Sequence, residues 1–200
     1  MKPDFNLLDA FKIFDFKGIG NVSVQDIIQA LKDNLNFHDF THDDIYLLFR
    51  RFDKNQDGKL NFQEFSNMIL PVSREYAALL TDRPDYYMSR GVSPMQFFNH
   101  ETRNEFRQLW SVMFKTERSC ENLRQNLRSR PYFNLKQAFA FMDTDLDGFL
   151  QIEDFREFLG NFGFYATERE LQGIIHKCDK NVNGRITFAE FVDEFQPKLS

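Results

Sequence analysis

The stretch DKNQDGKLNFQE, at positions 53–64 of the 200-residue chain, decides the fold. Oxygen-bearing side chains stand at its first, third, fifth, ninth and twelfth positions, and a glycine stands at its sixth. A 12-residue loop with this spacing surrounds Ca²⁺, because the seventh residue adds a backbone carbonyl and the twelfth a bidentate carboxylate. The stretch therefore predicts a calcium site whose ligands are Asp53, Asn55, Asp57, the carbonyl of Lys59, Asn61 and Glu64.

The same frame occurs four times in the chain. Its loops begin at Asp15, Asp53, Asp143 and Asp179, and each carries glycine at the sixth position and an acid at the twelfth. Apolar residues at helical spacing flank every loop. The first two loops are close together, as are the last two, and an insertion of roughly fifty residues separates the pairs. We therefore expect an all-α fold in which two pairs of helix-loop-helix units are joined by a helical insertion.

The loops of a pair can also contact each other through the residue at position 8. Val22 and Leu60 are the apolar residues there in the first pair, and Leu150 and Ile186 in the second. We expect each couple to form a short antiparallel β pairing between its two loops. The predicted domains are 1–71 for the first pair, 72–131 for the insertion and 132–200 for the second pair.

The third loop has the densest negative charge of the four. Its predicted ligands are Asp143, Asp145, Asp147, the carbonyl of Phe149, Gln151 and Asp154. Asp154 is one methylene shorter than glutamate, which compromises bidentate coordination. Mg²⁺ takes an octahedral shell with monodentate carboxylates, so we expect this loop to hold either Mg²⁺ or Ca²⁺.

The fourth loop keeps a glutamate at its last position but has fewer charges. Its predicted ligands are Asp179, Asn181, Asn183, the carbonyl of Arg185, Thr187 and Glu190. Only two of these ligands are carboxylates, and affinity for Ca²⁺ depends on the charge of the ligands. We therefore expect Ca²⁺ binding that is weaker than in the loop at 53–64.

The first loop departs from the ligand pattern. It has Lys17 at its third position and Ile19 at its fifth, where oxygen ligands are needed. We expect this loop to bind no metal and to serve as a scaffold for its neighbour.

The quoted loops and their flanking helices resemble the EF-hand superfamily of calmodulin, troponin C and centrin, over roughly residues 4–70 and 132–196. The resemblance implies paired hands that form two lobes, and lobes that can open a hydrophobic groove for a partner helix when Ca²⁺ binds. An insertion of this size is absent from calmodulin and centrin. Similar arrangements occur among EF-hand proteins of ciliates and flagellated protists, and this resemblance implies a place in the cilium or cytoskeleton.

The insertion is the basic part of the chain, with ten Arg or Lys against seven Asp or Glu in residues 72–131. Ser93-Pro94 predicts the start of a helix that runs through Phe97 and Phe98 to about Arg128. Three roles stay open for this helix. It can occupy the groove of its own lobe through Trp110, pack the two lobes together, or dock on another protein's acidic surface.

Composition limits the other classes of function. A net charge of −5 disfavours nucleic acid as a partner. Two cysteines are too few for a disulfide framework, and the N-terminus lacks the apolar core of a signal peptide, so we expect a cytoplasmic protein. Neither a lipidation motif nor an apolar run long enough for a membrane anchor is present.

Enzymatic activity is not expected, because the four histidines are scattered with no spacing typical of a metal site or a catalytic triad. Two readings of function remain. The first is a calcium sensor that binds a partner protein, as an amphipathic helix, in hydrophobic grooves. The second is a constitutive structural subunit of a cytoskeletal or ciliary assembly, which needs metal for folding. The 25 phenylalanines against six methionines suit a dedicated partner.

Overall fold

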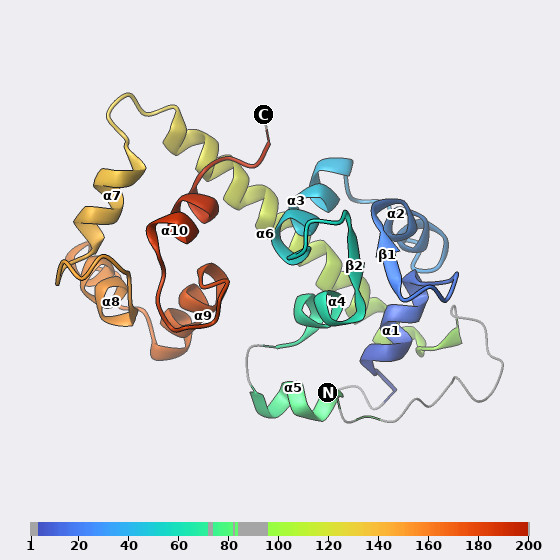
Figure 1. The fold of residues 1–200 in the computed structure, drawn as a ribbon. Coiled ribbons are helices and arrows are strands. Elements are labelled where there is room, and N and C mark those ends of the chain that lie inside the picture. Colours follow the sequence, from blue (N-terminus) through green and yellow to red (C-terminus); the bar gives the residue numbers. More distant parts are fainter. Residues whose placement is uncertain (1–3, 72–73, 82, 84–95, 200) are drawn as a thin grey trace. The chain divides into compact units, whose positions relative to one another are not determined.

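The computed structural model describes residues 4–71, 74–81, 83 and 96–199 (Figure 1). The helices are α1 (Leu7–Phe14), α2 (Val24–Asp33), α3 (His42–Phe52), α4 (Phe62–Ile69), α5 (Arg74–Thr81), α6 (His100–Arg128), α7 (Leu135–Met142), α8 (Ile152–Asn161), α9 (Glu168–Cys178) and α10 (Phe188–Phe195). Two strands, β1 (Asn21–Ser23) and β2 (Lys59–Asn61), complete the secondary structure of these residues. The predicted all-α fold with four helix-loop-helix units is confirmed.

The chain divides into two compact units, Met1–Cys120 and Glu121–Ser200. We call α1–α4 with their loops the N-terminal lobe, and α7–α10 with their loops the C-terminal lobe. The first part of α6 belongs to the first unit and its last turns to the second. The division of the chain into domains at residues 71 and 131 stays a prediction.

Each calcium-type loop also begins the helix that follows it. Loop position 9 is the N-cap residue of that helix and loop position 12 is its third residue, and the two form a capping box. The pairs are Ser23 with Asp26, Asn61 with Glu64, Gln151 with Asp154, and Thr187 with Glu190. The residues that suit metal coordination therefore also stop the loop and start the helix.

The predicted contacts between neighbouring loops are present in both lobes. In the N-terminal lobe β1 pairs with β2 in antiparallel fashion, with Val22 opposite Leu60. In the C-terminal lobe Leu150 and Ile186 form one antiparallel bridge, and their two N–H···O hydrogen bonds both measure 2.9 Å. All four side chains are fully buried, so each pairing sits under the two loops of a lobe and holds them side by side.

Helix α6 completes the hydrophobic core of the N-terminal lobe. Phe106, Trp110 and Phe114 follow one another at four-residue intervals, which places them on one face of the helix. All three are buried in the same cluster as the core of α1–α4. The Trp110 ring lies 5.1 Å from that of Phe14, and the Phe114 ring lies 5.8 Å from that of Phe40 (centroid distances). Of the three roles that the sequence left open, the structure shows the first: the insertion occupies the groove of its own lobe.

Polar contacts at the edge of this face fix the position of α6 along the groove. The guanidinium of Arg118 donates to both carboxylate oxygens of Asp44 on α3, with Nε at 2.9 Å from Oδ1. Arg51, near the end of α3, pairs with Glu117. At the other end of α6 the hydroxyl of Thr102 donates to Asp4 at 2.5 Å. The helix is therefore held by aromatic packing in its middle and by charged groups on either side.

The start of α6 differs from the prediction. The sequence predicts Phe97 and Phe98 inside the helix, but both precede it, and the predicted start at Ser93-Pro94 lies outside the described residues. The Asn99 side chain accepts from the backbone N–H of Thr102 at 2.9 Å and so caps the helix just after the two rings. Both rings are buried in the core as part of the segment that leads into α6.

The ion pair between Asp44 and Arg118 makes stability dependent on pH. Burial raises the pKa of Asp44, but hydrogen bonds from Arg118 and Thr41 outweigh it, and the pKa lies below its ordinary value. A depressed pKa in the folded state stabilises the fold above the ordinary value, and this contribution disappears as the pH falls through the folded pKa, below about 4. We expect Asp44→Asn to cost about 1–3 kcal/mol at pH 7, typical of a lost hydrogen bond to a charged group, and less at pH 3.

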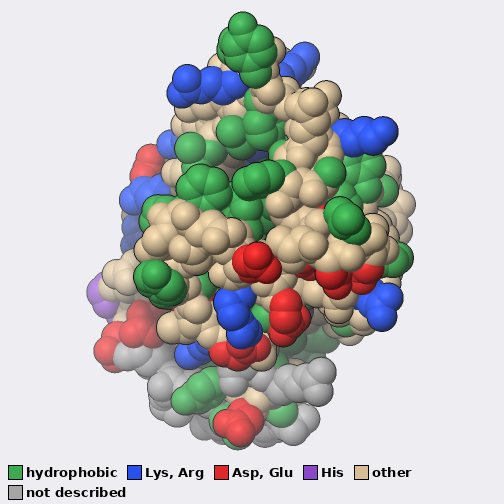
Figure 2. All heavy atoms as spheres, turned by 90° about the vertical axis from the view of Figure 1, so that its left-hand side faces the viewer, with side chains coloured by type: hydrophobic (Ala, Val, Ile, Leu, Met, Phe, Trp, Pro, Cys, Tyr) green, Lys and Arg blue, Asp and Glu red, His purple; other side chains and the backbone are tan. Residues whose placement is uncertain are grey.

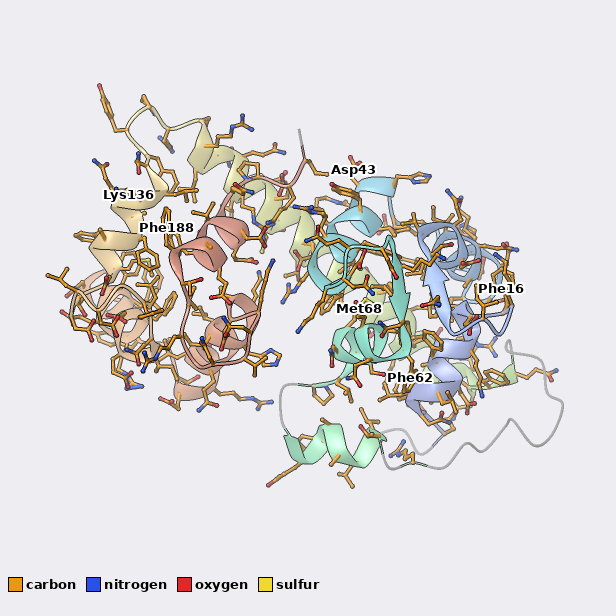
Figure 3. All side chains as sticks on the ribbon, viewed as in Figure 1. Phe16, Asp43, Phe62, Met68, Lys136 and Phe188 are labelled. Carbon is orange, nitrogen blue, oxygen red and sulfur yellow. The ribbon has the colours of Figure 1, made fainter. Side chains whose placement is uncertain are left out.

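Urea unfolding at the two pH values measures this difference. The matched control is Asp43→Asn, since Asp43 is the neighbouring acid in the first turn of α3 and its side chain is exposed (Figure 3). An Asp44→Asn effect that is equal at pH 7 and pH 3, or no larger than the control, would contradict the assignment.

The C-terminal lobe has its own core, formed by nine buried residues that include Phe139, Leu150 and Phe191. The end of the chain is tied to the last turns of α6. Glu121, which is buried, accepts from the backbone N–H groups of Lys198 and Leu199 at 2.9–3.1 Å. These bonds join α6 and the segment after α10 within the second unit.

Candidate metal centres

The loop at 53–64 folds around its own carboxylates. The Asp53 carboxylate accepts from the backbone N–H of Gly58 at 2.9 Å and of Asp57 at 3.2 Å, which curls the loop inward. Gly58 has φ +76°, the left-handed conformation that glycine adopts without strain, so the sharp turn requires this residue. The Glu64 carboxylate joins the two ends of the loop, since it accepts from the N–H of Lys54 and of Asn61, both at 3.0 Å.

The loop at 143–154 brings three carboxylates together. One oxygen from each of Asp143, Asp145 and Asp147 lies within 4.8 Å of the other two. Asp154 accepts from the N–H of Thr144 at 3.1 Å and of Gln151 at 2.8 Å. The shorter aspartate therefore makes the same two backbone contacts as Glu64 does in its loop. Three anionic side chains at this separation repel one another, and a divalent cation bound between them would relieve the repulsion.

The loop at 179–190 has the same arrangement with fewer charges. Asp179 accepts from the N–H of Gly184 at 2.7 Å, and Glu190 accepts from Lys180 and Thr187 at 3.0 and 2.9 Å. Burial raises the pKa of Glu190, but hydrogen bonds from Thr187 and Lys180 lower it below its ordinary value. The Glu190 carboxylate is therefore ionised at neutral pH, as a cation ligand must be.

The loop at 15–26 contains a cation of its own. The ammonium Nζ of Lys17, at the third position, lies 2.8 Å from Oδ1 of Asp26 at the twelfth. Asp15 still accepts from the N–H of Ile19 and Gly20 at 2.9 and 2.8 Å, so the turn is kept. Burial raises the pKa of Asp26, while hydrogen bonds from Lys17 and Ser23 lower it to a net value below the ordinary one. Lys17 thus neutralises the acid that would otherwise face a metal ion.

This lysine has a role that the sequence analysis did not anticipate. The sequence predicts only that Lys17 excludes metal, whereas in the structure its ammonium group is also the partner of Asp26. A positive side chain at position 3 and an acid at position 12 of one loop form a pattern that could have indicated the ion pair, because the two positions face each other across such a loop.

The three remaining loops fit a hard divalent cation. Their position-1 and position-12 carboxylates and the oxygens at positions 3 and 5 come from a loop of twelve residues that is closed by its own backbone N–H groups. All the side-chain atoms that could coordinate the metal are oxygens, which Ca²⁺ and Mg²⁺ prefer, and neither a thiol nor an imidazole is among them.

Comparison with known proteins agrees with this chemistry. The EF-hand domain pair family matches residues 4–70 and 132–196, which together are more than half of the chain. The chain is 29% identical over 150 residues to the probable calcium-binding protein CML17 of Arabidopsis thaliana, a match that covers 72% of this chain and 80% of that protein. It is 35% identical over 65 residues to mouse calcium-binding protein 5, which covers 32% of this chain and 38% of the mouse protein.

The chain belongs to the EF-hand family and is a calcium-binding protein. The predicted resemblance to calmodulin-like proteins is confirmed by these matches, and membership of a family of regulators agrees with the expectation that the chain is not an enzyme. Within the described residues, no helix is both long and apolar enough to cross a membrane.

Proposed function

We propose that the chain is a calcium-responsive regulator whose C-terminal lobe binds a helix of a partner protein, while its N-terminal lobe holds α6. The observation that carries this proposal is the contrast between the linkers of the two lobes. In the N-terminal lobe Phe37 and Phe40 of the α2–α3 linker pack against Phe114 of α6. In the C-terminal lobe Phe164 and Tyr165 of the α8–α9 linker are 67% and 89% exposed.

The exposed aromatic residues of the C-terminal lobe border a groove of about 510 Å³. We call this the C-terminal groove and define it by Leu159, Phe164, Tyr165, Glu170, Ile174 and Lys177. Figure 2 shows hydrophobic side chains gathered on a face of the molecule to which α7 and α8 contribute, and Phe141 and Phe162 of this lobe are also well exposed. Exposed apolar surface of this kind marks sites of protein interaction.

Calcium would act on this groove through the two loops of the same lobe. The loop at 143–154 directly follows α7, and the loop at 179–190 lies between α9 and α10. Metal binding in paired hands changes the angle between the helices of each hand and thereby the width of the groove. The ligands that we propose are those predicted from the sequence, with Ca²⁺ at 53–64 and 179–190 and Mg²⁺ or Ca²⁺ at 143–154.

The second candidate function is that of a constitutive structural subunit of a cytoskeletal or ciliary assembly. The N-terminal lobe favours this candidate, because α6 already fills its groove. Trp110 is 0% exposed, and its helix is held by ion pairs as well as by packing. A lobe that is closed by its own chain has no groove to offer an external helix. The two candidates therefore differ in whether partner binding by the whole chain depends on Ca²⁺.

The two candidate functions can be distinguished by a Ca²⁺ titration at about 1 mM Mg²⁺ in the presence of ANS, a hydrophobic dye that binds exposed apolar surface. We expect dye fluorescence to rise at about 0.1–10 µM Ca²⁺, the range of sensor hands. Glu190→Gln, in the C-terminal lobe, should abolish the rise, whereas Glu64→Gln, in the N-terminal lobe, should leave it. Dye binding that is independent of Ca²⁺ would support the constitutive subunit instead.

A further inference from the structure

The helices of the two lobes correspond in order and in length. Helices α3 and α9 both have 11 residues, both follow a threonine N-cap with a capping box, and both end directly before a loop. Asp44 in the third position of α3 therefore corresponds to Glu170 in α9, and Arg51 corresponds to Lys177. Leu31 of α2 likewise corresponds to Leu159 of α8. The C-terminal groove is thus the counterpart of the part of the N-terminal lobe that faces Phe114, Glu117 and Arg118 of α6.

The N-terminal lobe shows what such a surface binds. Helix α6 inserts three aromatic rings at four-residue intervals, Phe106, Trp110 and Phe114. One turn after the last ring, Arg118 donates two hydrogen bonds to the carboxylate of Asp44. Oδ2 of Asp44 accepts a hydrogen bond from the backbone N–H of Thr41 in the capping box, and Oδ1 accepts one from Nε of Arg118.

Glu170 presents a carboxylate that can accept the same contact from an arginine. Its Oε2 accepts from the N–H and the hydroxyl of Thr167, at 2.8 and 2.7 Å. The hydrogen bonds from Thr167 also lower its pKa below the ordinary value, so the carboxylate is ionised at neutral pH. Glu170 is exposed and lines the C-terminal groove, whereas Asp44 is buried under Arg118. Lys177, at the opposite end of this helix, lies 3.1 Å from Glu194.

We infer that the C-terminal groove recognises an amphipathic helix with two or three aromatic residues at four-residue intervals and an arginine one turn after the last, and that Glu170 selects this arginine. The inference rests on the proposed function and specifies the partner. A guanidinium fits because it can donate two parallel hydrogen bonds to one carboxylate, as Arg118 does to Asp44.

The occupant is a helix of another protein rather than α6 of a second copy. The aromatic face of α6 is buried in its own N-terminal lobe, with Trp110 0% exposed and Phe114 1% exposed. To leave that lobe, α6 would have to expose this face and break its ion pairs with α3. A partner helix that is exposed before binding has no such cost.

A peptide with the sequence of residues 100–119 reproduces the inferred pattern and serves as the probe. It carries a fluorescent label at its N-terminus, and its anisotropy is measured with the full chain at saturating Ca²⁺. We expect saturable binding. Glu170→Gln, which keeps a capping residue at this position, should weaken binding about fivefold, as loss of a partly exposed ion pair does.

The peptide with Arg118→Gln should bind the unchanged chain about fivefold more weakly than the original peptide does. Its affinity should not fall further when it is measured with the Glu170→Gln chain. The matched control is Glu168→Gln, since Glu168 lies in the first turn of the same helix and is not among the residues that line the groove. Equal binding of both peptides, or an unchanged affinity in Glu170→Gln, would overturn the role of Glu170 but leave helix binding by the lobe intact. No binding of either peptide, together with a Ca²⁺-dependent rise in ANS fluorescence, would overturn the inferred pattern alone.

Discussion

Trp110→Ala is expected to destabilise the N-terminal unit by about 3–5 kcal/mol, the cost of truncating a fully buried tryptophan. The reason is that the indole ring is 0% exposed and packs against Phe14, Phe106 and Phe114 at centroid distances of 5.1–6.3 Å. The loss is about a fifth or more of the 5–15 kcal/mol of total stability that proteins typically have. Urea unfolding followed by circular dichroism measures the change.

Two further variants, one at Trp110 and one close to it, serve as controls for the stability cost of Trp110→Ala. Val112→Ala changes an exposed residue of the same helix and should cost less than about 1 kcal/mol. Trp110→Phe keeps an aromatic ring and removes an indole N–H that has no hydrogen-bond partner among the described residues, so it should cost much less than alanine. If Trp110→Ala were as mild as Val112→Ala, α6 would not be part of the core of this lobe.

Glu64→Gln is expected to remove the tightest Ca²⁺-binding event of the chain. Glu64 is the proposed bidentate ligand, and its carboxylate also closes the loop through Lys54 and Asn61. Loss of a direct ligand should weaken binding more than the roughly 10–100-fold that loss of an outer contact costs. Isothermal titration calorimetry with Ca²⁺ shows the event and its disappearance.

The equivalent change in the first loop is the matched control. Asp26→Asn alters the same loop position, but Lys17 already neutralises Asp26. We expect the number of Ca²⁺ ions bound and their affinities to stay unchanged in this variant. Equal losses in Glu64→Gln and Asp26→Asn would show that the first loop binds metal and that our assignment of the loops is wrong.

Much of this fold could be predicted because the loop chemistry is local. A glycine at the sixth position and an acid at the twelfth fix a turn and a helix start within twelve residues, as Gly58 and Glu64 do. The contacts of Val22 with Leu60 and of Leu150 with Ile186 followed from equal positions in neighbouring loops. Periodicity also gave the end of α6 at Arg128.

The contacts over long sequence distances could not be decided from the sequence. The position of Trp110 depends on packing against Phe14, which is 96 positions earlier in the chain. The periodicity of an amphipathic helix shows that it has an apolar face but does not show which lobe that face covers. The ion pair of Arg118 with Asp44 joins residues from the insertion and from the first pair of hands, and it emerges only in three dimensions. The structure therefore decided among three roles for α6 that the sequence had left open.

Hydrogen exchange of the full chain with and without Ca²⁺, resolved by segment with mass spectrometry, tests the central claim most directly. The claim is that α6 stays in the N-terminal lobe while the C-terminal lobe responds to Ca²⁺. We predict that residues 104–118 stay protected in both conditions, and that protection of residues 159–177 changes with Ca²⁺. Loss of protection in 104–118 on Ca²⁺ binding, with 159–177 unchanged, would contradict it and would make the N-terminal lobe the switch.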